Sequence, residues 1–256
     1  MKDILFEIPT ADQQLSIRGI KNFAVSEDKP SKRAVFHVHG IISRTNEYLD
    51  KSLLKSFLKQ GYDVFRFQLH ANFPNCRKLM DCGLSDHASD LNAVLEHFAK
   101  DYEEVYLTGH SLGGAVIMLA QPRNIKAISL WDPCFDLKSF FQSQIAQEID
   151  PGHYLIIWNI QFLIGKKMVD EACLYGPSDS LELSKKLAQT PIQVIHPRQG
   201  TFVTDTSWHS AGHDKNCRVM IEDAGHCFDE NDKVDELLSH TLTFFEQFHE
   251  KTLPHD

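Results

Sequence analysis

The run Gly109-His110-Ser111-Leu112-Gly113-Gly114 decides how this sequence is interpreted. It follows the strand-like stretch 104–107 and precedes residues 112–120, which have the composition of a buried helix. Glycines two residues before and after a serine allow the sharp strand-to-helix turn that exposes a nucleophilic hydroxyl. The helix N-terminus also places the Leu112 backbone NH and the positive end of the helix dipole beside a developing oxyanion. We therefore predict that Ser111 is a nucleophile rather than a helix cap in an ordinary turn.

Strands and helices alternate along the chain on both sides of this run. The expected strands are 3–8, 14–20, 34–39, 63–67, 104–107, 125–131, 191–196 and 217–221, and the expected helices are 47–60, 86–99, 112–120 and 233–249. Such alternation predicts the α/β class, with a mostly parallel sheet and helices on both faces. Residues 135–188 break this alternation, although 154–158 and 162–165 within them are strand-like. We interpret residues 1–134 and 189–256 as one core and 135–188 as an inserted cap.

A base for Ser111 is expected near the C-terminus, because enzymes whose nucleophilic serine lies in such a strand-to-helix turn have the chain order Ser, acid, His. Ala224-Gly225-His226 follows the last predicted strand, so His226 is the predicted base. The acid is open between two residues, with a water-assisted dyad of Ser111 and His226 as a further alternative. Asp132 directly follows a strand, and Asp205 lies a few residues beyond Gly200, which stands where the acid is usually found. We favour Asp132, since a strand end orients a histidine better than a loop does.

The residues that contact the oxyanion and the substrate are predicted from where they lie along the chain relative to the expected strands and the cap. Ile41, in the His39-Gly40-Ile41 turn after an early strand, is the expected second oxyanion donor beside Leu112, with His39 shaping the turn. Apolar residues of the cap either line a substrate pocket or form the core of the cap; the candidates for substrate binding are Tyr154, Trp158 and Phe162, together with Ile157 and Leu163.

Composition excludes several classes of protein. A net charge of -9 without a cluster of Lys and Arg argues against a nucleic-acid partner. No apolar stretch is long enough for stable membrane insertion, and the N-terminal residues lack the apolar core of a signal peptide, so we expect a cytoplasmic location. The six scattered cysteines and fourteen histidines form no metal-binding motif, so no metal and no cofactor is predicted.

The sequence resembles the α/β-hydrolase superfamily, in the branch of monoacylglycerol lipases, serine aminopeptidase-like hydrolases and feruloyl-type esterases. The resemblance spans nearly the whole chain and rests on His39-Gly40, on Gly61-Tyr62-Asp63-Val64, on the Ser111 run and on Ala224-Gly225-His226. It implies an eight-stranded sheet. Besides Gly200, the chain departs from these relatives at Leu69-His70-Ala71-Asn72, where they carry an Arg-Gly-His-Gly turn.

The expected function is hydrolysis of a small carboxylic ester through an acyl-enzyme, in the manner of a carboxylesterase or lipase. Thioesterase or amidase activity would use the same three side chains. From a different class, a binding protein that keeps the fold without turnover is the alternative, since fold alone does not establish function. A haloperoxidase or a carbon-carbon hydrolase on the same scaffold is a weaker third interpretation. The sequence does not predict the oligomeric state.

Overall fold

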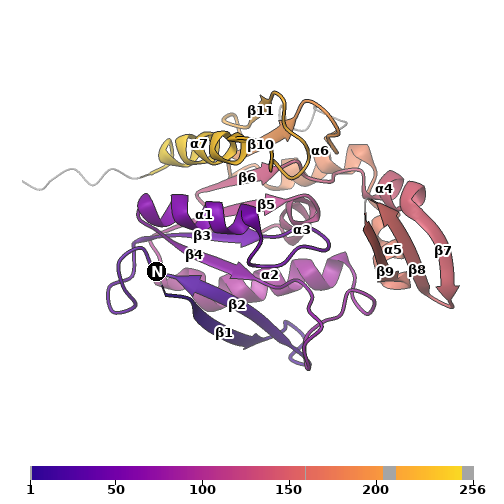
Figure 1. Ribbon diagram of the computed structural model, residues 1–256. Coiled ribbons are helices and arrows are strands. Elements are labelled where there is room, and N and C mark those ends of the chain that lie inside the picture. The colour runs from indigo at the N-terminus through magenta and orange to yellow at the C-terminus, as the bar shows by residue number, and fades with distance from the viewer. Residues whose placement is uncertain (1, 159, 204–211, 250–256) are drawn as a thin grey trace, which may run out of the picture.

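The main sheet has eight strands in the order β1-β2-β4-β3-β5-β6-β10-β11, in a computed structural model that describes residues 2–158, 160–203 and 212–249 (Figure 1). The strands are β1 (Ile4–Pro9), β2 (Ser16–Asn22), β3 (Arg33–Val38), β4 (Tyr62–Phe67), β5 (Glu104–His110), β6 (Ala127–Trp131), β10 (Ile192–Pro197) and β11 (Cys217–Ile221). Strands β4, β3, β5, β6, β10 and β11 pair in parallel, whereas β2 pairs antiparallel with β1 and with β4. The two strands predicted at 3–8 and 14–20 form an antiparallel pair, and the predicted mostly parallel sheet is confirmed.

Helices cover both faces of this sheet, as the alternation of the sequence predicts. Helices α1 (Tyr48–Lys59) and α7 (Lys233–Glu246) pack together on one face, and α2 (Leu84–Phe98) and α3 (Leu112–Ala120) pack together on the other. Successive side chains of a strand point to opposite faces, so Val35 joins the core under α1 and α7, while Phe36 joins the core under α2 and α3. A short 3-10 helix, η1 (Ala99–Asp101), follows α2, and α6 (Pro177–Lys186) packs against α3.

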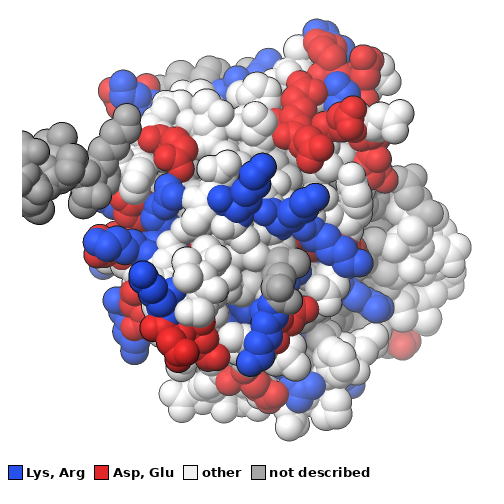
Figure 2. Space-filling view, turned by 60° about the vertical axis from the view of Figure 1, so that its left-hand side comes forward, with Lys and Arg blue, Asp and Glu red and all other residues white. Residues whose placement is uncertain are grey.

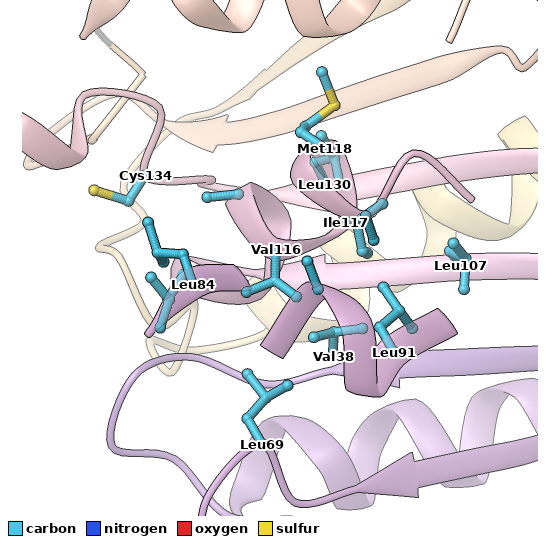
Figure 3. Close-up of a cluster of buried hydrophobic side chains, with 14 of the residues drawn as sticks. Val38, Leu69, Leu84, Leu91, Leu107, Val116, Ile117, Met118, Leu130 and Cys134 are labelled. Carbon is cyan, nitrogen blue, oxygen red and sulfur yellow. The ribbon is translucent and has the colours of Figure 1, made fainter. Parts of the chain in front are cut away.

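Helix α3 lies deep in the second of these cores. Its side chains Val116 and Ile117 lie among Val38, Leu91 and Leu107, which come from β3, α2 and β5 (Figure 3). The backbone of α3 approaches β3 closely, because a Cβ built on Gly113 would lie 2.1 Å from the carbonyl oxygen of Val38. This close packing sets the position of the turn that precedes α3.

The segment expected to be a cap contains a second sheet of three antiparallel strands. Strand β8 (His153–Trp158) lies between β7 (Ile145–Asp150) and β9 (Ile160–Gly165), with α4 (Leu137–Gln144) before them and α5 (Lys166–Ala172) after them. Figure 1 shows this small sheet at one end of the molecule, beside the main sheet. The strands expected near 154–158 and 162–165 are confirmed, whereas β7 was not predicted because its six residues, three of them polar, do not alternate between polar and apolar.

No helix in the described part of the chain is both long enough and apolar enough to cross a membrane. The predicted helix boundaries differ from those observed by a few residues: α2 begins at Leu84 rather than at 86, and α7 ends at Glu246 rather than at 249.

Candidate active site

Ser111 occupies a strained turn between β5 and α3. Its backbone has φ 55° and ψ −119°, a combination that non-glycine residues adopt only where the surrounding structure enforces it. The two flanking glycines make the turn possible, since a Cβ on Gly109 would lie 2.9 Å from the carbonyl oxygen of Gly113. The Ser111 backbone NH donates to the carbonyl of Trp131, which anchors the turn to the end of β6.

His226 and Asp132 meet at the same edge of the sheet. Nδ1 of His226 lies 2.6 Å from Oδ2 of Asp132, whose side chain is fully buried. The other carboxylate oxygen, Oδ1, accepts hydrogen bonds from Thr201 Oγ1 at 2.6 Å and from the Phe202 backbone NH at 3.1 Å. Three donors therefore hold this carboxylate against the histidine ring. The alternative acid, Asp205, lies outside the described residues.

The loop after β10 explains why Gly200 can replace an acid. Gly200 has φ +64°, a left-handed conformation that favours glycine, and the residue after it, Thr201, directs its hydroxyl to Asp132. Strands β6 and β10 are parallel neighbours, and the Asp132 backbone NH donates to the carbonyl of Ile195, so their ends lie side by side. The carboxylate thus lies at the end of β6 instead of in the loop after β10, and Thr201 of that loop supports it with a hydrogen bond. Sequence reasoning missed Thr201; its hydroxyl directly after Gly200 was the only signal.

Two histidines hold the turn that carries Ile41. Nε2 of His39 accepts a hydrogen bond from the Leu69 backbone NH at 3.0 Å, so its proton is on Nδ1, which donates to the Gly40 carbonyl at 2.7 Å. That carbonyl belongs to the same peptide unit as the Ile41 NH. His70 Nε2 donates to the carbonyl of Ile41, which belongs to the next peptide unit. Both peptide units around Ile41 are therefore fixed.

His70 was seen in the sequence only as a departure from relatives, and its contact with the Ile41 turn was not predicted. Burial lowers the pKa of His39 to about 3 and also lowers the pKa of His70. Both rings are therefore neutral near pH 7, and they act as hydrogen-bonding groups of fixed tautomer. The expectation that His39 shapes the turn agrees with this geometry.

His110, inside the opening sequence run, contacts the loop of the predicted base. Its Nε2 donates to the backbone carbonyl of His226 at 2.9 Å, and the two rings lie 4.7 Å apart between centroids. Burial lowers the pKa of His110 to about 3, so the ring is neutral. The His226 ring also makes an edge contact with Phe202 at 4.6 Å between centroids. The imidazole of His226 is thus held by packing as well as by Asp132.

Two cavities adjoin Ser111. The smaller, of about 10 Å³, is apolar; its lining residues are Ile41, Ser111, Leu112, Cys134, Leu137, Phe140, Phe141, Trp158 and Phe202. The larger, of about 420 Å³, contains His226; besides His226 it is lined by His37, His39, Gly40, Ile41, Ile42, Ser43, Glu47, Tyr48, Leu49, Asp50, His110, Ser111, Trp158, Ile160, Cys227 and Asp229. The two predicted oxyanion residues, Ile41 and Leu112, both lie against Ser111 in the smaller cavity.

Of the three predicted substrate-binding residues, only Trp158 lies in these cavities, where it lines both. Tyr154 and Phe162 are half-buried and pack against the hydrophobic core instead. The register of β8 and β9 does not separate the three residues: Ile156 pairs with Phe162, so Tyr154, Phe162 and Trp158 share one face of the small sheet, and their positions along it differ. Trp158 is at the end of β8, and that end adjoins Ser111.

Within the described residues, no three His, Cys, Asp or Glu side chains are grouped so that they could hold a metal ion. The six cysteines, all described, are unpaired.

Comparisons with known proteins bear on the fold of the chain. A family model described as serine aminopeptidase, S33, matches residues 29–152. No curated protein matches the sequence significantly. Among solved structures, Est1E from Butyrivibrio proteoclasticus with ferulic acid bound is 18% identical and has a TM-score of 0.77, with 95% of this chain and 98% of that chain covered.

Two further structures have the same fold. The esterase domain of a Rhodothermus marinus protein is 15% identical, with a TM-score of 0.73 and with 97% of this chain and 99% of that chain covered. The alpha/beta hydrolase domain-containing protein 10 from mouse is 13% identical, with a TM-score of 0.73 and with 96% of this chain and 100% of that chain covered. Together, the serine turn between β5 and α3, the mostly parallel sheet and these matches show that the chain has the α/β-hydrolase fold.

Proposed function

We propose that this protein is a serine hydrolase that cleaves carboxylic esters of small molecules through an acyl-enzyme. Ser111 is the nucleophile, His226 the base and Asp132 the acid that orients it. The observation that carries the proposal is the 2.6 Å contact between Asp132 Oδ2 and His226 Nδ1 at the edge of the sheet where the Ser111 turn lies. Because Nδ1 donates to the carboxylate, the Nε2 lone pair of His226 is left to accept a proton.

The proposed reaction has two halves. Ser111 Oγ attacks the ester carbonyl carbon while His226 Nε2 takes the hydroxyl proton, and the NH groups of Ile41 and Leu112 stabilise the oxyanion. His226 then gives the proton to the departing alkoxide, which leaves an acyl-serine and an alcohol. In the second half His226 takes a proton from a water molecule, which attacks the acyl-serine; the acyl–Oγ bond breaks, the carboxylic acid leaves, and His226 returns the proton to Ser111 Oγ.

We further propose that residues 135–188 form a cap that shapes the acyl side of the site, with 1–134 and 189–256 as the catalytic core. This interpretation is supported by Phe140, Phe141 and Trp158, which come from the inserted segment and line the cavity beside Ser111. The cytoplasm remains the proposed compartment, because unpaired cysteines suit a reducing environment.

Labelling with an uncharged fluorophosphonate tests the class of enzyme. We expect wild type to be labelled and Ser111→Ala to remain unlabelled, since only an activated serine attacks the probe. Absence of labelling in wild type, under conditions that label a known serine hydrolase, would favour a non-catalytic binding protein.

A panel of p-nitrophenyl esters of increasing acyl length, with matched thioester and anilide substrates, tests the bond that is cleaved. We expect short acyl esters to have the highest kcat/KM, because the small apolar cavity beside Leu112 has a volume of only about 10 Å³. A preference for thioesters or anilides would reassign the protein to thioesterase or amidase activity on the same residues.

A further inference from the structure

The two cavities beside Ser111 can be assigned to the two halves of an ester, and this step rests on the function proposed above. The departing alkoxide must be protonated by His226, so it has to lie on the side of Ser111 where His226 is exposed. His226 lines the larger cavity and does not line the smaller one. The larger cavity is therefore the leaving-group cavity, and the smaller, apolar one is the acyl cavity.

Among the residues that the structure describes, the leaving-group cavity is lined by acidic side chains and by no basic ones apart from histidines. Its described lining includes the carboxylates Glu47, Asp50 and Asp229, and it includes neither lysine nor arginine. Burial lowers the pKa values of two of its histidines, His37 and His39, so these rings add no positive charge near pH 7. A concave surface with charge of one sign concentrates ligands of the opposite charge.

Asp50 supplies a second observation, which is independent of the exposed acids. Its side chain is only 2% exposed, and its Oδ1 has no hydrogen-bond partner among the described residues. Nε2 of His37 lies 3.9 Å away, beyond hydrogen-bond distance. The charge of Arg66 also acts on Asp50, but its Nη atoms donate to Thr45 O and Asn22 Oδ1. Burial raises the pKa of Asp50 to about 7, so near pH 7 this acid is divided between its neutral and its charged form. A cation bound beside the unpartnered Oδ1 would favour the charged form.

Aromatic rings complete the lining. Tyr48, which is 57% exposed, and Trp158 both border the leaving-group cavity, and the face of an aromatic ring attracts organic cations.

Beyond the cavity residue Asp229, the segment between β11 and α7 carries four further acids, Glu222, Asp223, Glu230 and Asp232. Figure 2 shows that on the face in view the acidic side chains gather densely at the upper right, apart from a row of Lys and Arg across its middle.

We propose that the leaving-group cavity binds the cationic group of an ammonium-bearing alcohol, so that the preferred substrates are short-chain esters of amino alcohols. The acids Glu47, Asp50 and Asp229 of the cavity wall provide the attraction, together with the rings of Tyr48 and Trp158. An anionic alcohol would meet the same carboxylates and be rejected.

The test compares choline with 3,3-dimethyl-1-butanol, an alcohol of the same shape in which carbon replaces the charged nitrogen. Each alcohol is used to protect Ser111 of the full chain against an uncharged fluorophosphonate, so the readout does not depend on the choice of acyl group. For each alcohol we measure the concentration that halves the labelling rate. We expect this concentration to be lower for choline than for 3,3-dimethyl-1-butanol by roughly fivefold or more, and we expect high salt to reduce the ratio of the two concentrations.

Glu47→Gln and Asp229→Asn should each reduce the ratio, whereas Asp28→Asn, which removes the same charge from an exposed loop outside the cavity lining, should leave it unchanged. Asp229 is exposed, so its variant is expected to fold normally. Equal protection by both alcohols, better protection by the neutral one, or protection by neither, overturns the inference while the labelling itself upholds the hydrolase. Failure of wild type to be labelled at all overturns the proposed function, and this inference with it.

Discussion

Asp132 is the residue on which the proposed mechanism depends most. One of its carboxylate oxygens holds His226 and the other is held by Thr201 and Phe202. Asparagine keeps the shape but can offer an NH₂ group to Nδ1, which favours the wrong tautomer of the ring. We expect Asp132→Asn to lower kcat on p-nitrophenyl acetate by on the order of 10³- to 10⁴-fold, with little change in KM.

Thr201→Val is the matched control for this variant, because it removes one hydrogen bond to Asp132 and leaves the carboxylate in place. We expect a decrease in kcat of roughly tenfold, comparable with the free energy of one hydrogen bond to a charged group. Wild-type turnover in Asp132→Asn would exclude Asp132 as the acid and make Asp205→Asn the next variant to measure.

His70 is expected to position the oxyanion turn without touching the substrate. Its hydrogen bond to the Ile41 carbonyl fixes one of the two peptide units around the proposed donor. We expect His70→Phe to lower kcat by roughly tenfold, about the free energy of one hydrogen bond. The affinity for a trifluoromethyl ketone, which forms a tetrahedral adduct with serine, should fall by the same factor while KM stays nearly constant.

A purely structural role for His70 would give a different result. In that case the melting temperature of His70→Phe would fall and kcat at a permissive temperature would match wild type. His70→Gln retains an NH donor and should restore part of the lost affinity for the ketone.

At the scale of secondary structure, the contact of α3 with β3 determines where Ser111 lies. A Cβ on Gly113 would lie 2.1 Å from the Val38 carbonyl oxygen, so alanine would force the helix and the strand apart. We expect Gly113→Ala to reduce the free energy of unfolding by about 3 kcal/mol or more, measured by urea denaturation. Activity should be lost as well, because α3 carries the Leu112 donor.

Gly152→Ala is the control for this substitution. Gly152 has φ +89°, and the nearest atom to an added Cβ is a side-chain carbon of Lys166 at 3.6 Å, an ordinary contact. Only the backbone strain of a left-handed alanine should matter, at about 1 kcal/mol. Equal effects of the two variants would show that close packing of α3 is not what limits stability.

At the scale of the whole molecule, buried neutral histidines make the fold sensitive to acid. The pKa values of His39 and His110 fall to about 3 in the folded state, against 6.5 as the ordinary value, and those of His37 and His87 are lowered as well. A lowered folded-state pKa means that the unfolded chain binds the proton first. The stabilisation is complete above pH 6.5 and is lost progressively as the pH falls toward 3.

Urea denaturation at pH 7 and pH 5 measures this effect. We expect His39 and His110 each to lower the free energy of unfolding by about 2 kcal/mol between these pH values, and His37 and His87 to act in the same direction. Asp50 acts in the opposite direction, because burial raises its pKa to about 7, so its ionisation costs stability as the pH rises toward 7; it offsets about one histidine. His87→Leu should show a smaller loss than wild type, and unchanged stability of wild type at pH 5 would contradict the account.

Sequence patterns were most informative where local chemistry and element order decide the outcome. Helical and strand periodicity predicted the parallel sheet, and the glycines around Ser111 predicted the turn, because sterics within a few residues require them. The order of serine, acid and histidine along the chain predicted which loop carries His226. Strand β7 was missed because its sequence has no apolar pattern typical of a strand. It is a strand because it pairs with β8.

What the sequence determined by itself is therefore the fold class, the strained serine turn and the element that carries each proposed catalytic group. Only the tertiary structure decided that Asp132 reaches His226, that Thr201 and His70 support the site, and that Trp158 rather than Tyr154 or Phe162 borders Ser111. The physical reason is distance along the chain. Periodicity and turn chemistry act over a few residues, whereas these contacts join strand ends and loops that are brought together only when the sheet is assembled and packed.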